Sequence, residues 1–282
     1  MPTMKVNMKI VSYGGGTNST AMLVGLYERG ERPDAITFAD TGGEKPHTYE
    51  HIAEMQKWCL KVGFPQIEIL KGAMRQQIID GSLEQECLRL GSLPSKAYGF
   101  SSCSMKWKVD PQRRYVKEFS SKHSVELGQI TRLIGFDADE HIRVERGRNA
   151  TKNEEAKQEY PLYDWGWGRE ECVEAIARAG LQQPGKSACF FCPSSKKHEI
   201  IELRERYPEL LQRALEMERR ALAGEGQAPK TTGAGLGRSF GWGAWLRMVD
   251  DAAAHDADLV TRQIKLFCDA GVPEMDCGCY DG

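Results

Sequence analysis

The sequence lacks several features that would decide its class at once. It has no apolar run that approaches eighteen residues, so we predict no transmembrane helix and no membrane partner. Residues 1–8 lack the apolar stretch of a secretory signal, and we therefore expect a cytoplasmic protein. An excess of charge is also missing, because 38 basic and 40 acidic residues give a net charge of −2. This balance excludes binding of nucleic acid by overall charge and leaves only a local basic groove open.

Cysteine is present in an odd number, nine, which without a secretory signal argues against a disulfide scaffold. Four cysteines lie singly in apolar patterns of helical spacing, where we expect small buried side chains: Cys59, Cys87, Cys172 and Cys268. The other five lie beside Gly, Ser or Pro in segments typical of loops, a placement that suits thiolates in metal or redox chemistry: Cys103, Cys189, Cys192, Cys277 and Cys279.

Apolar segments alternate with helical patterns over the first 140 of the 282 residues. The periodicity predicts strands at residues 5–12, 34–39, 66–70 and 131–136, and helices at 19–29, 47–62 and after Pro111. This order predicts an α/β fold, a Rossmann-like parallel sheet with helices on both faces. Further helices are predicted at 170–179, 196–223 and 242–270. We therefore predict a sheet domain over residues 1–195 and a helical C-terminal region over residues 196–282.

The segments after three predicted strands, residues 13–16, 40–43 and 135–140, are polar or rich in glycine. Ligands of open parallel sheets bind beyond the carboxyl ends of the strands, so we expect these segments to line one pocket. A second glycine-rich stretch, residues 224–243, has the composition of a surface linker. The alternative is a lid over the pocket, with Lys230 and Arg238 meeting an anionic ligand.

Residues 12–20, Ser-Tyr-Gly-Gly-Gly-Thr-Asn-Ser-Thr, connect the first predicted strand to the first helix. Three glycines allow a sharp turn and the close approach of a ligand. Free amides at a helix N-terminus favour an anion, and Ser19 and Thr20 add hydroxyl donors, so we expect a phosphate or pyrophosphate here. The spacing matches neither the Walker A pattern nor Gly-x-Gly-x-x-Gly, and a tight structural turn is the alternative.

This loop resembles the PP-loop of the adenine nucleotide alpha-hydrolase-like superfamily, Ser-Gly-Gly-x-Asp-Ser, with Gly14 at the first Ser and Asn18 at the Asp. Within that superfamily the chain resembles the phosphoadenosine phosphosulfate (PAPS) reductase family. Four further segments are similar, in order, to that family's Asp-Thr-Gly…Pro-Glu-Thr, Cys-x-x-x-Arg-Lys-Val-x-Pro, Gly-x-Arg-x-Asp-Glu-Ser…Arg and Pro-Leu-x-Asp-Trp motifs: residues 38–48, 103–111, 135–143 and 160–165. The resemblance covers residues 12–193.

The resemblance implies an adenine-nucleotide site, ATP or a sulfonucleotide, with magnesium as an accompanying ion. The implied nucleotide-binding residues are Ser12, Gly14, Gly15, Gly16, Thr17, Asn18, Ser19, Thr20, Asp40, Thr41, Gly42, Gly135 and Asp139. Asp40, at a strand end, suits a ribose hydroxyl or a phosphate-bound metal, and equally a helix cap. Lys106, Lys108 and Arg143 are candidates to neutralise phosphate or sulfate oxygens. We predict Lys106, Arg143 and Cys277 as catalytic residues.

The segment Cys189-Phe-Phe-Cys192-Pro is compatible with half of a zinc site, a redox dithiol or part of an iron–sulfur cluster. The resemblance implies a 4Fe-4S cluster on Cys103, Cys189 and Cys192, as in cluster-bearing adenylyl sulfate reductases. Residues 274–279 loosely resemble the C-terminal segment that carries that family's nucleophile. In one arrangement Cys277 is the nucleophile and Cys279 is a metal ligand. In a second, Cys277 or Cys279 is the fourth ligand of the cluster. In a third, three cysteines hold the cluster and one iron keeps an open site that can carry a sulfide.

Three functions follow from this resemblance. The first is an oxidoreductase that reduces PAPS or adenylyl sulfate to sulfite with electrons from a thioredoxin-like partner. The second is an ATP-dependent sulfurtransferase that adenylates an acceptor, a nucleic-acid base or backbone, before sulfur displaces AMP. The third is a nucleotide- or cluster-sensing module without turnover, which the changed positions Gly14 and Asn18 keep open. We expect an enzyme, with the reductase as the first reading.

Overall fold

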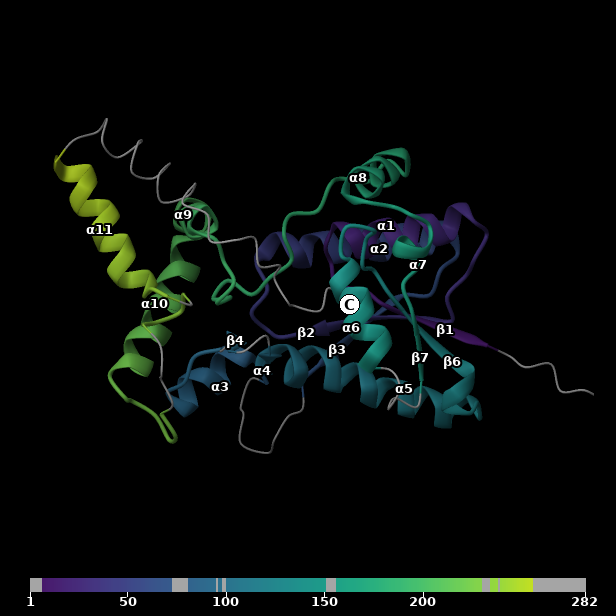
Figure 1. The fold of residues 1–282 in the computed structure, drawn as a ribbon, viewed down its shortest axis with the longest axis horizontal. Coiled ribbons are helices and arrows are strands. Elements are labelled where there is room, and N and C mark those ends of the chain that lie inside the picture. Colours follow the sequence, from purple (N-terminus) through teal and green to yellow (C-terminus); the bar gives the residue numbers. More distant parts are fainter. Residues whose placement is uncertain are drawn as a thin grey trace, which may run out of the picture. The chain divides into compact units, whose positions relative to one another are not determined.

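A computed structural model describes residues 7–72, 81–94, 96–97, 100–150, 156–229, 234–237 and 239–255 (Figure 1). These residues belong to two compact units. The described part of the first unit comprises residues 7–72, 106–150 and 156–187, and that of the second comprises 81–94, 96–97, 100–105, 188–229, 234–237 and 239–255. The predicted domains, 1–195 and 196–282, stay a prediction.

The first unit is built on a five-stranded parallel sheet in the order β3-β2-β1-β6-β7. Its strands are β1 (Met8–Ser12), β2 (Ala35–Asp40), β3 (Ile67–Lys71), β6 (Ile130–Ile134) and β7 (Lys157–Glu159). β1 pairs in parallel with β2 on one side and with β6 on the other, so it occupies the centre of the sheet. The predicted Rossmann-like fold class is confirmed, and the four predicted strands lie within two or three residues of their predicted bounds.

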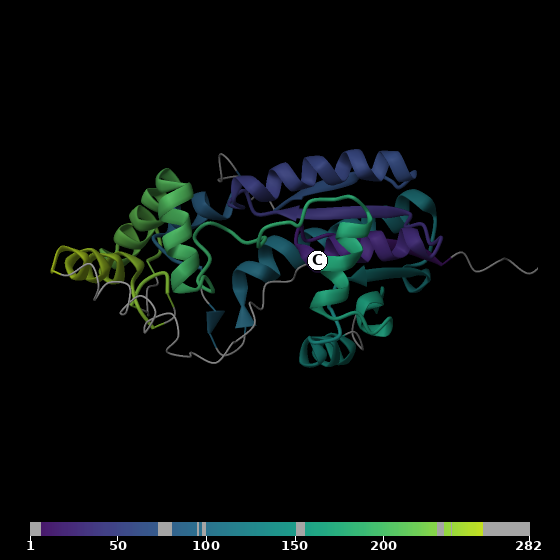
Figure 2. The same cartoon turned by 90° about the horizontal axis from the view of Figure 1, so that it is seen from above.

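Helices cover both faces of this sheet (Figures 1 and 2). They are α1 (Thr17–Glu28), α2 (Pro46–Val62), α5 (Asp110–His123), α6 (His141–Ala150), α7 (Pro161–Asp164) and α8 (Arg169–Arg178), with a π-helical turn (Met105–Val109) leading into α5 and a 3-10 turn (Leu127–Gln129) into β6. Alternation along β1 explains the two layers: Val11 packs with residues of α1, α2 and α8, whereas Ile10 packs with Val116 and Phe119 of α5.

The described part of the second unit is mainly helical. Its elements are α3 (Leu83–Leu90), the short antiparallel pair β4 (Lys96–Ala97) and β5 (Phe100–Ser101), α4 (Ser102–Ser104), α9 (Lys197–Arg206), α10 (Pro208–Leu222) and α11 (Trp242–His255). The single helix predicted over 196–223 is wrong in one respect, because it is broken at Tyr207. Pro208 lacks the N–H that would continue α9 and instead begins α10 at its first position.

The glycine-rich stretch before α11 is fixed at its described end by one buried carboxylate, Glu218 of α10. Its two oxygens accept backbone hydrogen bonds from Leu236 at 2.6 Å, Trp242 at 2.8 Å and Gly243 at 2.8 Å. Two of these donors open α11, so Glu218 caps this helix from a different helix. The lid hypothesis rested on Lys230 and Arg238, which lie outside the described residues.

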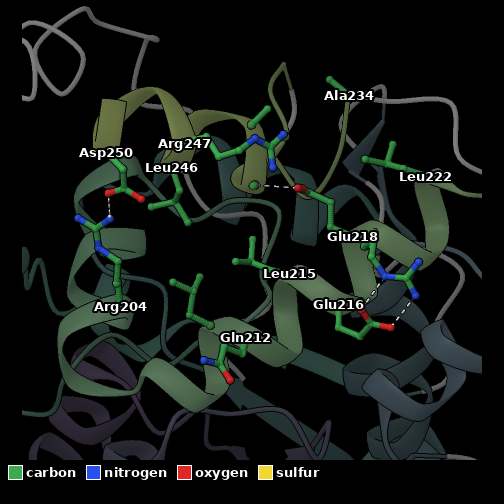
Figure 3. Close-up of a pocket in the computed structure, with 15 residues that line it drawn as sticks. Arg204, Gln212, Leu215, Glu216, Glu218, Leu222, Ala234, Leu246, Arg247 and Asp250 are labelled. Carbon is green, nitrogen blue, oxygen red and sulfur yellow. Dashed lines mark hydrogen bonds and ion pairs between the residues drawn. The ribbon is translucent and has the colours of Figure 1, made fainter. Parts of the chain in front are cut away.

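A hollow of about 650 Å³ lies within the second unit, between α10 and α11 (Figure 3). Leu215 and Leu246 face it, and ion pairs line its two ends, Arg204–Asp250 at 2.7 Å and Arg219–Glu216 at 2.8 Å. None of the residues predicted as site residues lines this hollow. Among the described helices, none is long and apolar enough to cross a membrane.

We expect the hydrogen bonds of Glu218 to contribute to the stability of the fold. Glu218→Ala leaves three backbone donors without their acceptor, and we expect it to lower the free energy of unfolding by about 3 kcal/mol. Glu216→Ala is the matched control, because it removes an exposed carboxylate of the same helix that binds only Arg219, and it should leave the urea midpoint unchanged. Equal midpoints for the two variants in urea unfolding would contradict the capping role.

Candidate functional site

Two loops leave the sheet side by side at the carboxyl ends of its central strands. Ser12, the last residue of β1, is in register with Ile134, the last residue of β6. The strand order reverses between β1 and β6, since β2 lies on one side of β1 and β6 on the other. Such a reversal separates the loops above the sheet and is where open α/β sheets bind their ligands. The predicted segments 13–16 and 135–140 therefore meet at one edge.

The loop after β1 presents a run of backbone N–H groups. Gly15 has a positive φ of 77°, which turns the chain sharply into α1. The N-terminal cap of α1, Gly16, has no side chain to offer, so the first turn is uncapped. Within the described part of the chain, no acceptor binds the N–H groups of residues 14–19. We call these six N–H groups the cradle; their number and the helix dipole favour a multiply charged anion.

The hydroxyl groups predicted beside the loop are mostly used inside the protein. Ser19 donates to the carbonyl of Gly16 at 3.2 Å. Thr20 Oγ1 lies 3.1 Å from the Tyr13 hydroxyl and 3.0 Å from His51 Nε2, and all three side chains are buried. Burial lowers the pKa of His51, which keeps its imidazole neutral at neutral pH. Backbone N–H groups are thus the main donors that the loop offers to a ligand.

Ser12 is also engaged within the protein, because its hydroxyl donates to Gln112 and accepts from Arg132 at 3.3 Å. After β2 the carboxylate of Asp40 is already bound within the protein: its Oδ1 accepts from the Gly42 N–H and from the hydroxyl of Tyr49 in α2, both at 2.8 Å. Burial, followed by the charge of Asp40, raises the pKa of Tyr49. Ligand binding by Ser12, Asp40, Thr41 and Gly42 stays a prediction.

On the β6 side, Asn18 connects the two loops. Its amide donates to Asp137 at 2.9 Å and to Glu140 at 3.1 Å, and its oxygen accepts from Arg169 at 3.3 Å. Gly135 permits this approach, because a Cβ there would lie 3.1 Å from the backbone of Ser19. Asn18 thus holds two carboxylates together at the first turn of α1.

Burial raises the pKa of both carboxyl groups, Asp137 and Glu140. The amide of Asn18 partly offsets this for Asp137, and the charge of Arg143 does so for Glu140. Asp139, the predicted nucleotide ligand of this segment, is exposed and accepts from the backbone N–H of Arg169 at 3.2 Å. Its binding role stays a prediction.

The predicted basic residues have partners in the protein. Arg143 forms an ion pair with Glu140, and its guanidinium lies 4.2 Å from the centre of the Phe136 ring. Lys108 is buried, with its ammonium 3.3 Å from Oε1 of the buried Glu44. Lys106 is half-buried and lies 6.0 Å from the centre of the Trp107 ring. The charges of Arg143 and Lys108 are therefore balanced by carboxylates.

Cys189 and Cys192 occupy the two ends of a turn, in which the Cys192 N–H donates to the Cys189 carbonyl at 3.0 Å. Cys189 is half-buried and Cys192 is buried, and Cys103 is half-buried in the same unit. No three metal-ligating side chains come together within the described ranges, so a complete ligand set for a cluster is not assembled there. Cys277 and Cys279, predicted as nucleophile and metal ligand, lie outside the described residues, as does Cys268.

The structure adds residues to the site that the sequence patterns did not indicate. Arg169 binds Asn18, His51 binds Thr20, and Gln183 and Ser187 contact the glycine loop. Each is a single polar residue far from its partner in the chain, and no spacing rule relates the two.

No family model and no curated protein matches the sequence. Among solved structures, the chain is similar to the U34-tRNA thiolase NcsA from Methanococcus maripaludis, solved with its 4Fe-4S cluster. The TM-score is 0.40 and the sequence identity 15%, over 86% of this chain and 80% of that chain. A likeness of this degree says nothing about which reaction this chain performs.

The carboxylates around Asn18 predict a dependence of stability on pH. Both acids have a raised pKa in the folded chain, so folding binds protons and stability falls as the pH rises above about 4. Asn18→Asp adds a third carboxylate and removes the amide donor, which should lower the free energy of unfolding by about 2 kcal/mol at neutral pH.

The test is urea unfolding of this variant at about pH 5 and about pH 8, on either side of neutrality. Asn18→Ala is the control, because it removes the same hydrogen bonds without adding a charge, and it should show the weaker dependence on pH. A loss in Asn18→Asp that is no larger at the higher pH would contradict the arrangement.

Proposed function

We propose that this chain is a PP-loop enzyme that binds ATP at the cradle and adenylates an acceptor, with release of pyrophosphate, as a step in sulfur transfer. One observation carries the proposal: an uncapped helix N-terminus preceded by three glycines lies where the strand order reverses, with six N–H groups that no described residue uses. Such a cradle suits the oxygens of a polyphosphate, which accept several hydrogen bonds at once.

The charges around the cradle favour ATP over a sulfonucleotide. PAPS carries a sulfate joined to its 5′-phosphate and a separate 3′-phosphate, and each of these anions suits a cation. Of the three basic residues expected to meet those groups, Lys106, Lys108 and Arg143, two are held by carboxylates: Arg143 by Glu140 and Lys108 by Glu44. The cradle offers six N–H groups that no described residue uses, and it suits a leaving pyrophosphate.

In the proposed reaction an oxygen of the acceptor attacks the α-phosphorus of ATP. The bond from that phosphorus to the bridging oxygen breaks, and pyrophosphate leaves with the electron pair while the cradle stabilises its charge. A sulfur nucleophile then attacks the activated carbon or phosphorus of the acceptor, and AMP leaves. The acceptor class is the one that the sequence resemblance implies, a nucleic-acid base or backbone.

Cys189 and Cys192 are described candidates for the sulfur chemistry, because their backbones are joined in one turn. We propose that they bind a 4Fe-4S cluster together with Cys103 and a cysteine of the tail, Cys277 or Cys279. If only Cys103, Cys189 and Cys192 held the cluster, one iron would lack a cysteine ligand and would be open to carry a sulfide. No step above depends on it.

The second candidate function is sulfonucleotide reduction, in which Cys277 attacks the sulfur of PAPS or adenylyl sulfate. The bond from sulfur to the phosphate oxygen breaks, the adenosine phosphate leaves, and a thioredoxin-like dithiol reduces the enzyme S-sulfonate to release sulfite. The motifs over residues 38–48 and 103–111 favour it. It requires no ATP.

The two functions differ in their substrates, and calorimetry separates them. We expect ATP to bind and PAPS to bind at least tenfold more weakly. Gly15→Val should weaken ATP binding by about thirtyfold, a loss of about 2 kcal/mol, because the side chain is strained at positive φ and meets Thr48, whose Cγ2 is 3.2 Å from a Cβ at this position.

Gly30→Val is the matched control. Gly30 also has a positive φ, of 68°, but a Cβ there would meet nothing within 4 Å, and it lies beyond the far end of α1. This variant should lose stability and keep its ATP affinity. Tight binding of PAPS with release of sulfite, and no binding of ATP, would establish the reductase instead.

The cluster makes a separate prediction about metal content. Protein purified without oxygen should contain about four iron and four sulfide per chain and absorb broadly in the visible range. Cys192→Ser should remove most of the iron, whereas Cys172→Ser should keep it. Cys172 is a matched control because it is buried and burial raises the pKa of its thiol to about 12, which leaves it unsuited to bind metal. Full iron content in Cys192→Ser would show that this ligand set is wrong.

A further inference from the structure

A segment far along the chain lies against the glycine loop. Residues 183–187, which we call the strap, follow α8 and contain no helix or strand. Gln183 Nε2 donates to Thr17 Oγ1 at 2.8 Å, and Ser187 Oγ donates to the Gly14 carbonyl at 2.6 Å. Between them, His47 Nε2 lies 3.2 Å from the carbonyl oxygen of Lys186. The strap therefore has three polar contacts with the loop and the start of α2.

The bond from Ser187 fixes the direction of one donor in the cradle. In a planar trans peptide the C=O and the following N–H point in opposite directions. The Gly14 carbonyl is turned toward Ser187, so the Gly15 N–H is turned away from it. Glycine at positions 14, 15 and 16 leaves this peptide free to rotate when nothing holds it. Ser187 itself is 5% exposed, which keeps water from replacing its hydroxyl.

The bond from Gln183 acts on the hydroxyl of Thr17, the first residue of α1. Since the Thr17 oxygen accepts from the Gln183 amide, its own hydrogen is left to donate. Among the described residues no other side chain binds Thr17. The strap thus leaves one O–H donor and one directed N–H donor at the same turn.

We propose that Ser187 and Gln183 are positioning residues that aim the Gly15 N–H of the cradle and the Thr17 hydroxyl at the phosphate groups of the nucleotide. This inference rests on the proposed function. It concerns only one part of the nucleotide, however: the strap acts on binding of the polyphosphate and leaves recognition of the adenosine part unchanged. A strap that only stabilised the fold would have no such preference for one part of the ligand.

The test compares binding of three probes, ATP, inorganic pyrophosphate and adenosine, by calorimetry on the full chain. Ser187→Ala should weaken the binding of ATP and of pyrophosphate by the same factor, about tenfold, and leave the affinity for adenosine unchanged. Ser187→Thr restores the hydroxyl and should recover most of the affinity. Gln183→Leu, which keeps the bulk of the side chain without its donor, should weaken the same two probes.

Ser120→Ala is a closely matched control. Ser120 also donates its hydroxyl to a backbone carbonyl, that of Val125, at 2.6 Å, but it lies in α5 away from the loop. It should lower the melting temperature about as much as Ser187→Ala and leave all three affinities unchanged.

The possible outcomes test the positioning role of the strap separately from the proposed function. If the wild-type chain binds ATP and pyrophosphate and Ser187→Ala binds them equally well, the positioning role is wrong and the proposed function stands. If Ser187→Ala weakens the binding of adenosine by the same factor as the binding of ATP, the positioning role is also wrong, since the strap would then only support the fold. If the wild-type chain binds neither ATP nor pyrophosphate, both the proposed function and the inference are wrong.

Discussion

The parallel pairing of β1 with β6 is the constraint on which the candidate site depends. It brings the ends of two strands, Ser12 and Ile134, into register although 122 residues separate them along the chain. The glycine loop and the segment 135–140 leave the sheet at this edge, and Asn18 joins them. Without that pairing the cradle would be an ordinary helix N-terminus, a feature that most α/β units contain.

The charged side chains around the cradle are neutralised by ion pairs and hydrogen bonds with other side chains. Glu140 holds Arg143, Glu44 holds Lys108, and Asn18 donates to the buried Asp137 and the half-buried Glu140. The backbone N–H groups of residues 14–19 have no such partner among the described residues. Partial charges fixed in the backbone cost no reorganisation when a ligand arrives, which suits a leaving group that gains charge in the proposed reaction.

In both units a glycine-rich segment is fixed by hydrogen bonds with a side chain that lies far away in the sequence. In the first unit Ser187 binds the Gly14 carbonyl, and in the second Glu218 accepts N–H groups of Leu236, Trp242 and Gly243. In the second unit glycine allows the close approach, since a Cβ at Gly235 would lie 2.3 Å from Glu218 Oε2. Flexible composition is therefore compatible with a defined local structure.

The sequence by itself determined the parallel sheet, the positions of four of its strands along the chain and the position of the glycine loop, because periodicity and local turns are short-range properties. It also predicted a loop or turn at Cys189 and Cys192 from the neighbouring Pro193, and the two residues lie in one turn. Only the tertiary structure decided which polar groups stay available. Ser19 and Thr20 are bonded inside the protein, Arg143 is paired, and Ser187 reaches Gly14 across 173 residues. Hydrogen bonds between distant segments arise from packing and leave no periodic trace in the sequence.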